Sequence, residues 1–293
     1  MIHEIAPFAL DNQFRARLAE PGDTVLVFRG EEMLSLSGDS LVFPRLEQLQ
    51  GVTPDQLVYL FAISQMPFFM LSAGEDFLPP PDYAFVPASD MRQAQPQHLA
   101  YAGILGHQLY RWYMARRFCG ACGQKNAQDT MERMLYCPGC GHREYPAIMP
   151  AVIVGVIHGD SLLLTKYAGR VNPRWALVAG FTEAGETPEE TVRREVLEET
   201  GLHVTAITYY KSQPWPFSGS LLMGYFAQVE GPSELTLETR ELAEAEFMPR
   251  DMIDVPFEGL SLTNEMICCF RDLGPVPLLA QDPLRQAPYF PGI

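Results

Sequence analysis

Three glutamates near the middle of the sequence have a spacing that suits divalent-metal chemistry: Glu195, Glu198 and Glu199. On a helix, positions i, i+3 and i+4 share one face, so the three carboxylates would crowd together and repel one another. A hard cation such as Mg²⁺ or Mn²⁺ removes that repulsion and bridges the carboxylates to phosphate oxygens. The alternative is a solvated acidic helix face, which leaves unexplained the glycines at the ends of the elements within residues 180–202.

Two neighbours complete the candidate catalytic set. Glu186 lies in the loop before the predicted helix and can reach back toward the same face. Arg194 lies among the carboxylates and can form a charge-assisted pair with one of them, which would fix that side chain.

Four cysteines form two hooks of the kind that hold zinc, with fourteen residues between the hooks: Cys119, Cys122, Cys137 and Cys140. Each C-x2-C hook places two thiolates on one side of a turn, which matches tetrahedral Zn²⁺. Four thiolates leave no open position for water, so the predicted zinc is structural. Cys268 and Cys269 lie on a predicted apolar helix, and we interpret them as packing residues.

The segment SQPWPFSGS, residues 212–220, offers a stiff aromatic surface beyond the glutamates. Trp215 and Phe217 each follow a proline, so together they would form a preorganised stacking face for a flat base. Gln213 can donate and accept hydrogen bonds beside that face. On these residues alone, a proline-rich loop with buried aromatic side chains remains an open alternative.

Composition narrows the classes of function. The chain has 293 residues, 47% of them apolar and 19% charged, as expected of a globular protein with two or three small domains. A net charge of −15 argues against broad binding to phosphate backbones but not against an anionic small molecule held through cations. The N-terminus does not resemble a signal peptide, and no run of about 18 apolar residues occurs. We therefore expect no membrane span and a cytoplasmic protein with reduced cysteines.

The elements that must position these residues follow from periodicity and turn signals. Strands are predicted over 24–30, 32–38, 40–46, 151–159, 161–167, 203–213 and 220–229, and residues 59–71 form a buried strand or helix. Helices are predicted over 89–117, with Ser89 as cap, over 187–200 and over 258–274. The expected domains are an N-terminal domain (1–117), a zinc ribbon (118–144), a catalytic domain (145–274) and a proline-rich tail (275–293) that wraps the surface.

The spacing G-x5-E-x7-R-E-V-x-E-E-x-G-L over residues 180–202 resembles the Nudix box without a departure. The resemblance implies an α/β fold, a Nudix α/β/α sandwich, preceded here by a zinc ribbon and a smaller N-terminal α+β domain. It implies hydrolysis of a nucleoside diphosphate linked to another group, with Glu195, Glu198 and Glu199 holding Mg²⁺ or Mn²⁺ and one of them a candidate base. The metals would neutralise the pyrophosphate oxygens and lower the pKa of a bound water.

A fourth metal-binding glutamate is implied farther along the chain. The family has a stretch like E-L-x-E-A-x-W after the aromatic motif, and this sequence reads ELAEAEF from Glu241 to Phe247. The resemblance assigns Glu241 to the metal, although Phe247 replaces the usual tryptophan. Glu244 and Glu246 are the competing choices.

The segment SQPWPFSGS is similar to SQPWPFPxS of NADH pyrophosphatases, with Ser218 in place of proline. The zinc quartet and the pair Tyr145-Pro146 are also typical of that group. The resemblance implies hydrolysis of NADH or NAD⁺ to nicotinamide mononucleotide and AMP, removal of NAD caps from RNA 5′ ends, and a homodimer that donates Tyr145 across its interface. The substrate-binding residues that it implies are Tyr145, Phe181, Ala179, Gln213, Pro214, Trp215, Pro216, Phe217, Ser218, Gly219, Ser220, Glu132, Thr263 and Arg92.

Two other hypotheses remain. Ser218, and Thr263 in place of an alanine in the later motif, favour a pyrophosphatase that acts mainly on ADP-ribose or another dinucleotide. A regulatory protein that binds a nucleotide without cutting it would lack the box glutamates, which are all present. A basic patch at Arg111, Arg116 and Arg117 could hold the body of an RNA, or these side chains could form a solvated helix face.

Overall fold

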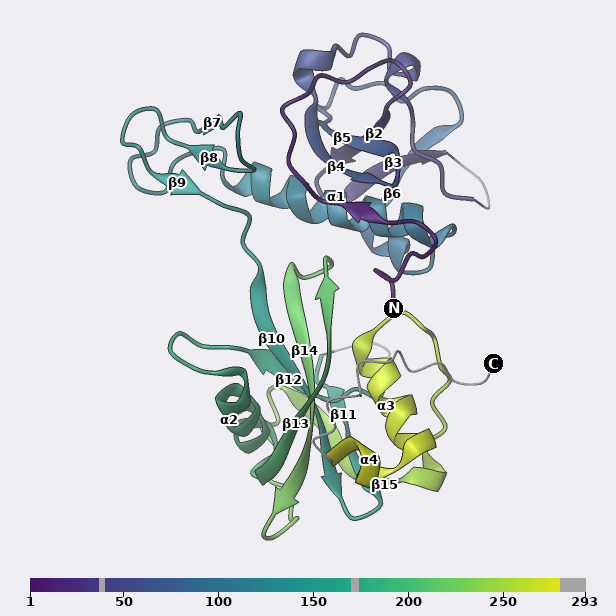
Figure 1. Cartoon of the computed structure of the whole chain (residues 1–293), viewed down its shortest axis with the longest axis vertical. Coiled ribbons are helices and arrows are strands. Elements are labelled where there is room, and N and C mark those ends of the chain that lie inside the picture. The colour runs from purple at the N-terminus through teal and green to yellow at the C-terminus, as the bar shows by residue number, and fades with distance from the viewer. Residues whose placement is uncertain (37–39, 170–173, 280–293) are drawn as a thin grey trace. The chain divides into compact units, whose positions relative to one another are not determined.

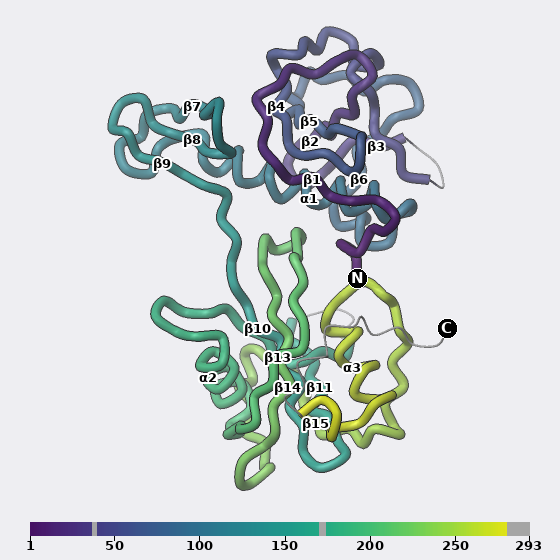
Figure 2. The backbone as a smooth tube through the Cα atoms, in the orientation of Figure 1, coloured from purple at the N-terminus to yellow at the C-terminus, as the bar shows by residue number. Residues whose placement is uncertain are grey.

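The computed structural model describes residues 1–36, 40–169 and 174–279, which form two compact units (Figures 1 and 2). The first unit comprises the described residues of the range Ile148–Trp215 and those from Ser220 to Leu279, together with Met1. The second comprises Ile2–Ala147 and Pro216–Gly219. The boundary that we placed between an N-terminal domain and a zinc ribbon lies inside the second unit and stays a prediction.

The second unit is built on a six-stranded sheet with the order β1-β4-β5-β2-β3-β6. Its strands are β1 (Leu10–Asp11), β2 (Thr24–Arg29), β3 (Glu32–Leu36), β4 (Val58–Ile63), β5 (Met66–Ser72) and β6 (Tyr83–Pro87). Short 3₁₀ turns lie at Leu46–Gln48, Pro54–Gln56 and Ala88–Arg92. One helix, α1 (Gln97–Ala115), packs on this sheet. The N-terminal part is therefore mixed in secondary structure and rich in strands.

Helix α1 lies close against the sheet because it carries a glycine at the contact. A Cβ atom on Gly106 would come within 2.3 Å of Leu26 Cδ1, so any larger residue would push the helix away. The predicted start of this helix at Ser89 is wrong. Pro96 precedes the first turn, and the residue before a proline disfavours helical geometry, so the helix begins at Gln97 and residues 88–92 form a separate 3₁₀ turn.

The structure also tests two predicted segments of the N-terminal part, residues 40–46 and 59–71. The strand expected over 40–46 is wrong: Leu41 and Val42 bond the chain individually, to Gln95 and Leu36, and a 3₁₀ turn begins at Leu46. A proline in that segment removes a donor, which suits an isolated contact better than a ladder. The ambiguous segment 59–71 is a hairpin of β4 and β5, with Ser64 in the turn at a φ of 54°.

The ribbon consists of three two-residue strands in the order β7-β8-β9, namely β7 (Ala127–Gln128), β8 (Leu135–Tyr136) and β9 (Arg143–Glu144). It is tied to the rest of its unit by Arg133, which donates to Asn12 and to the carbonyl of Leu60. Strands this short supply little stability of their own, so the ribbon depends on its cysteine hooks and on this anchor.

The first unit is a mixed α/β sandwich. Its sheet runs β13-β14-β10-β11-β15, with β12 paired to β10, and β10 and β14 are parallel. Helices α2 and α3 lie on opposite faces of the sheet (Figure 1). The elements are β10 (Met149–His158), β11 (Ser161–Tyr167), β12 (Val178–Phe181), α2 (Pro188–Thr200), β13 (His203–Trp215), β14 (Ser220–Glu230), β15 (Leu242–Pro249), η4 (Arg250–Met252), α3 (Leu262–Leu273) and α4 (Pro275–Leu279).

Strand β10 shows why both faces of this sheet need a helix. Val152 and Val154 pack with Val192 of α2, while Ile153 and Ile157 belong to the cluster that contains α3. Successive side chains of a strand point to opposite faces, so a continuous apolar run is buried on both sides. The predicted strands and helices of this unit are confirmed in type.

Only the first five residues of the predicted C-terminal tail lie within the described part of the chain. Residues 275–279 form α4, and the rest of the predicted surface-wrapping tail lies outside the described residues. Within the described part of the chain, no helix has the length and apolar character needed to cross a membrane.

Candidate active site and metal centre

The local sequence of α2 fixes where its carboxylates stand. Thr187 caps the helix by accepting from the Glu190 N–H at 3.2 Å, and the Glu190 carboxylate accepts in return from the Thr187 N–H at 2.7 Å. Gly201 ends the helix at a φ of 74°, where a residue with a Cβ is strained. The box is therefore a loop, a helix and a second turn, with both helix ends fixed.

Arg194 organises three of the glutamates. Its Nε and Nη2 donate to the two oxygens of Glu186 at 2.5 and 2.9 Å, and its Nη1 donates to Glu195 at 2.7 Å and Glu198 at 3.1 Å. A further bond from Nη2 reaches the carbonyl of Phe181 at 2.9 Å. A guanidinium fork with this many fixed acceptors is rigid. The sequence indicated a pair with one carboxylate, and the structure has a network of three.

Glu186 acts as the support of that network. Besides Arg194, its carboxylate accepts from the Glu183 N–H and from the Thr191 hydroxyl, both at 3.0 Å. The bonds from Arg194 lower the pKa of Glu186 to about 2, with a smaller contribution from the Glu183 N–H. Since its oxygens already accept four bonds, Glu186 is placed to position Arg194 and the loop.

Glu199 is the most unusual carboxylate of the site. Its residue is only 2% exposed, and its Oε2 is buried without a hydrogen-bond partner. Burial, followed by the charges of Glu195 and Glu241, raises the pKa of Glu199 to about 8, against the Ala179 N–H, which lowers it. A buried oxygen with no donor is costly unless a cation or proton binds there, so this carboxylate is suited to a metal.

Glu195 lies beside it, packed against the backbone of β12. Burial raises the pKa of Glu195, while its bond with Arg194 opposes that shift. A Cβ atom at Gly180 would fall 1.9 Å from the Glu195 Cδ, so only glycine leaves room for the carboxylate. The glycine that opens the box is thus required by the position of a glutamate.

Replacing Gly180 by alanine tests this contact. We expect Gly180→Ala to displace the Glu195 carboxylate and to lower Mn²⁺ affinity and metal-dependent turnover by roughly 10- to 100-fold, without unfolding the chain. Calorimetric titration with Mn²⁺ and circular dichroism would measure the two effects. Gly74→Ala is the control, because nothing lies within 4 Å of a Cβ at that position. Unchanged Mn²⁺ affinity in Gly180→Ala would contradict the role of this close approach.

The structure also separates the three glutamates that follow the aromatic motif. Glu241 lies just before β15, and its negative charge raises the pKa of both Glu195 and Glu199. Glu244 instead receives a 2.6 Å ion pair from Lys166, and Glu246 stands opposite Leu164 in the β11–β15 ladder. Of the three, Glu241 is the one whose charge is felt at the box.

The donor set fits a divalent cation. Carboxylates on α2 and at Glu241 interact electrostatically, two of them have raised pKa values, and one has an orphan oxygen. Their oxygens are less tightly grouped than the four thiols, with Arg194 bonded to two of the carboxylates. The residues that would hold the ion are Glu195, Glu198, Glu199 and Glu241.

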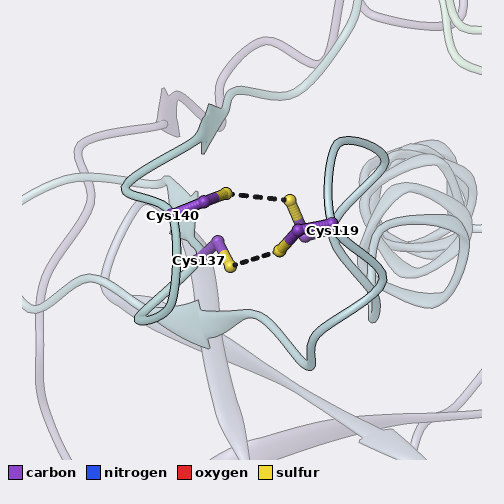
Figure 3. Close-up of side chains that lie close together, drawn as sticks. Cys119, Cys137 and Cys140 are labelled. Atoms are coloured by element: carbon purple, nitrogen blue, oxygen red, sulfur yellow. Dashed lines mark hydrogen bonds between the residues drawn. The ribbon is translucent and has the colours of Figure 1, made fainter.

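The cysteines form a site that is ready for zinc (Figure 3). In the described part of the chain their four sulfurs lie within 4.8 Å of one another, with Cys119–Cys140 at 3.6 Å and Cys122–Cys137 at 3.4 Å. Zn–S bonds of about 2.3 Å give tetrahedral S–S edges of ~3.8 Å, close to these values. A backbone bond from Cys140 lowers the pKa of the Cys137 thiol to about 7, against burial, which favours a thiolate ligand.

Several residues implied for substrate binding have structural partners. The Gln213 amide is fully buried: its Nε2 donates to the Leu260 carbonyl at 2.9 Å, and its Oε1 accepts from the Leu262 N–H at 2.7 Å. Gln213 thus fixes the start of α3, which carries Thr263 in its first turn. The Ala179 N–H is directed to Glu199 rather than into open space. Contact of these residues with substrate stays a prediction.

Other implied residues are accessible. Phe181 is 50% exposed at the end of β12, beside the box. In the second unit the Tyr145 hydroxyl donates to Glu132 at 2.9 Å, so the structure brings these two residues together. Arg92 is exposed at the end of a 3₁₀ turn. Trp215 and Pro214 are half-buried at the end of β13, Ser220 is buried at the start of β14, and Pro216–Gly219 belong to the second unit.

One residue of the network escaped the sequence reasoning. Thr191 is fully buried, and its hydroxyl donates to Glu186 and bonds the Thr187 carbonyl at 3.1 Å. A threonine one turn into a helix has no pattern that separates it from an ordinary packing residue. Its only signal is its position, one turn before Glu195 on the same helix face.

Comparison with known proteins agrees with this fold. The model of the NUDIX domain matches residues 148–267, so this part of the chain is a Nudix domain. The model of the NADH pyrophosphatase zinc ribbon domain matches residues 116–145. The chain thus carries a zinc ribbon of the NADH pyrophosphatase type directly before its Nudix domain.

Two relatives among curated proteins share the same name. Proteins named NAD-capped RNA hydrolase NudC are 38% identical over 167 residues in Pseudomonas putida (strain W619) and 39% identical over 151 residues in Enterobacter sp. (strain 638). The matches cover 56% and 52% of this chain, and 60% and 57% of the relatives, which is less than two thirds of their length. A NUDIX hydrolase structure from Nitrosomonas europaea aligns at 21% identity, with a TM-score of 0.47, over 53% of this chain and 90% of that one.

Proposed function

We propose that this protein is a metal-dependent pyrophosphatase that hydrolyses NADH and NAD⁺ to nicotinamide mononucleotide and AMP and removes NAD caps from RNA 5′ ends. The observation that carries the proposal is the buried Glu199 carboxylate, with its orphan oxygen, next to Glu195 and Glu241 in a Nudix domain. The zinc ribbon and the names of the relatives support the choice of NAD as substrate.

The chemistry follows from the charges at the site. A divalent cation, Mg²⁺ or Mn²⁺, would neutralise the pyrophosphate oxygens and lower the pKa of a coordinated water. Glu195, Glu198, Glu199 and Glu241 supply the negative charge for it. Arg194 fixes the positions of two of these carboxylates by donating hydrogen bonds to Glu195 and Glu198. One of these carboxylates would also act as the base for the attacking water.

The substrate assignment is tested by comparing the candidate substrates side by side. Purified protein with Mg²⁺ or Mn²⁺ is incubated separately with NADH, NAD⁺, ADP-ribose and a short NAD-capped RNA, and the products are resolved by chromatography. We expect NADH and capped RNA to be cut at the pyrophosphate, and the metal series to identify the preferred ion. Much faster cleavage of ADP-ribose than of NADH would overturn the substrate assignment in favour of the broader dinucleotide pyrophosphatase.

The aromatic motif makes a second prediction. We propose that Trp215 stacks on a base of the substrate, so Trp215→Ala should raise KM for NADH by about 10- to 100-fold, the usual worth of one stacked base, while kcat changes little. Steady-state kinetics measures the split. Tyr209→Ala is the control, because Tyr209 is an exposed aromatic residue of the same strand. Equal effects of the two substitutions on KM would contradict stacking.

We also propose a cytoplasmic homodimer. Four reduced thiols for zinc suit a reducing compartment. Large apolar side chains stand exposed on the ribbon and the residues around it, as at an interface: Phe118, Met131, Tyr145 and Ile148. Light scattering coupled to size exclusion should give twice the mass of one chain, and a monomer would remove the proposal that Tyr145 is donated by a partner.

A further inference from the structure

A pocket in the second unit lies apart from the glutamate site. It is formed where β4 and β5 of the sheet, the end of α1 and the strands β7 and β8 of the ribbon meet, and this open hollow has a volume of about 220 Å³. All of its lining residues belong to this one unit. Its place in the fold is therefore fixed by the packing of the ribbon on the N-terminal sheet.

The pocket gathers positive charge in a strongly acidic chain. Arg116, Arg117 and Lys125 line it. Arg116 has a carboxylate partner, Glu144, at 3.5 Å. Among residues 1–36, 40–169 and 174–279, no carboxylate lies within 4.0 Å of the charged groups of Arg117 or Lys125. With a net charge of −15, the chain has many acids available, and it leaves these two cations uncompensated.

Backbone contacts join the two segments that carry Arg117 and Lys125. The residue after Arg117, Phe118, forms a β-bridge with Lys125, and the Asn126 N–H donates to the Arg117 carbonyl at 2.9 Å. The pair therefore projects from adjoining backbone segments, one at the exit of α1 and one in the ribbon. Lys125 is paired with Phe118 and Arg117 lies opposite Asn126, so the two cationic side chains leave this short ladder on different faces, yet both line the same pocket. Two cations on the walls of one pocket supply positive charge for an oxyanion such as a phosphate.

A simpler explanation accounts for only part of this cluster. Arg116 and Arg117 directly follow α1, whose carbonyl end favours positive charge. That effect does not explain Lys125, which comes from the ribbon. Nor does it explain Asn126, whose Nδ2 donates to the Arg116 carbonyl at 2.9 Å while its Oδ1 is buried without a partner.

The other walls suit a flat, partly polar group. Val58, Met70, Met114 and Leu135 supply apolar surface, and Gln56 and Gln128 supply amides that can meet the edge of a base. A volume of about 220 Å³ lies below the range of about 300–1,000 Å³ for drug-sized ligands, so the occupant is a single small unit. Cations beside an apolar slot with amides match one nucleotide: its phosphate, its sugar and its base.

We propose that this pocket binds one nucleotide of a single-stranded RNA chain, with the phosphate held by Arg117 and Lys125. The inference rests on the proposed function, in which a capped RNA is cut at its 5′ end while the body of the chain needs a place to bind. It separates recognition of the RNA chain from recognition of the dinucleotide cap. A free mononucleotide shares the same chemistry, and the experiment distinguishes the two sources.

The test measures binding without hydrolysis. A fluorescent, uncapped ribo-oligonucleotide is titrated with the zinc-loaded full chain in the absence of Mg²⁺ and Mn²⁺, and anisotropy is followed at several salt concentrations. We expect Arg117→Gln/Lys125→Gln to weaken binding about tenfold at low salt and to lower the salt slope by about 0.7, the value for the one phosphate of a single strand that the two cations share. Arg29→Gln/Arg45→Gln is the control, with the same charge change in the same unit outside the pocket. Equal losses in the two double variants would overturn the site.

A second variant tests the pocket itself rather than its charge. Ser72 is exposed at the pocket and contacts Met114, so Ser72→Trp would fill the space without altering net charge. We expect it to weaken oligonucleotide binding at least fivefold. Retained binding in Ser72→Trp would show that the cations act as a diffuse field, which overturns the nucleotide pocket.

Kinetics and competition separate the remaining outcomes. Arg117→Gln/Lys125→Gln should lower kcat/KM for NAD-capped RNA about tenfold and leave that for NADH within twofold. A parallel fall on both substrates would overturn the assignment to the RNA chain. Displacement of the oligonucleotide by AMP at equal concentration would also overturn it, in favour of a free-nucleotide site. If the wild-type chain cuts neither NADH nor capped RNA, the proposed function fails, whatever the anisotropy shows.

Discussion

Glu199→Gln should lower metal-dependent pyrophosphate hydrolysis by about three orders of magnitude, equivalent to roughly 4 kcal/mol of transition-state stabilisation. The substitution keeps the size of the side chain but removes its charge and its ability to hold a proton. The Ala179 N–H that points at this carboxylate would then face an amide. Turnover of NADH with saturating Mn²⁺ measures the effect. Glu230→Gln, an exposed glutamate at the end of β14, is the control and should retain full activity.

Glu199→Gln should also change how the stability of the folded chain depends on pH. A raised native pKa of about 8, against an ordinary value of 4.5, means that the folded chain binds a proton which the unfolded chain releases. Without a divalent cation, stability therefore falls as pH rises from about 4.5 to about 8, by at most about 5 kcal/mol, and Mn²⁺ restores it. Glu199→Gln should remove most of this slope and melt higher than the wild-type chain at pH 8. Melting curves in buffer free of Mg²⁺ and Mn²⁺, with zinc retained, measure the slope.

Two outcomes would contradict this account. Full turnover in Glu199→Gln would place the metal elsewhere. A pH slope that persists unchanged in the variant would mean that other groups, such as Glu195 with its own raised pKa, cause the linkage. Since the activity and stability readouts move in opposite directions, a merely unfolded variant cannot imitate the expected result.

The sequence predicts the chemical groups of the site better than it predicts the residues that hold those groups in place. The i, i+3, i+4 spacing requires that Glu195, Glu198 and Glu199 share a region of α2, and the two cysteine hooks require convergent sulfurs. Both follow from local geometry, which sequence spacing encodes directly. The twofold burial of β10 likewise follows from a continuous apolar run. These features were predictable because each depends on neighbours in sequence.

The remaining details depend on partners distant in sequence. Gln213 could have faced a ligand, yet its amide bonds the backbone at residues 260–262, a contact that no local pattern encodes. Gly180 is part of a known spacing, but the reason for it, the Glu195 carboxylate, emerges only in three dimensions. The helix predicted from Ser89 begins at Gln97 because Pro96 disfavours helical geometry at the residue before it. Apolar periodicity alone does not reveal this interruption.

Cys137→Ser should abolish zinc binding, lowering zinc from about one ion per chain to near zero, because a hydroxyl is a poor replacement for the one thiol whose pKa falls to about 7. Elemental analysis of the purified protein measures the content. Cys268→Ser is the matched control: that thiol is buried in the first unit, outside the quartet, and zinc should be retained. A full complement of zinc in Cys137→Ser would refute the quartet.

The consequences of zinc loss should divide between the two units. The ribbon strands are two residues long and cannot persist without the metal, so the melting point of the second unit should fall by on the order of 10 °C. Glu132 and Tyr145, which lie in or beside the ribbon, would lose their relative position, and NADH turnover should fall with them. The carboxylates of α2 belong to the other unit and are held by Arg194, so Mn²⁺ affinity and its dependence on Glu199 should persist. Loss of turnover with retained Mn²⁺ binding would assign to the ribbon a part in holding substrate, whereas loss of both would make the zinc a condition for folding of the whole chain.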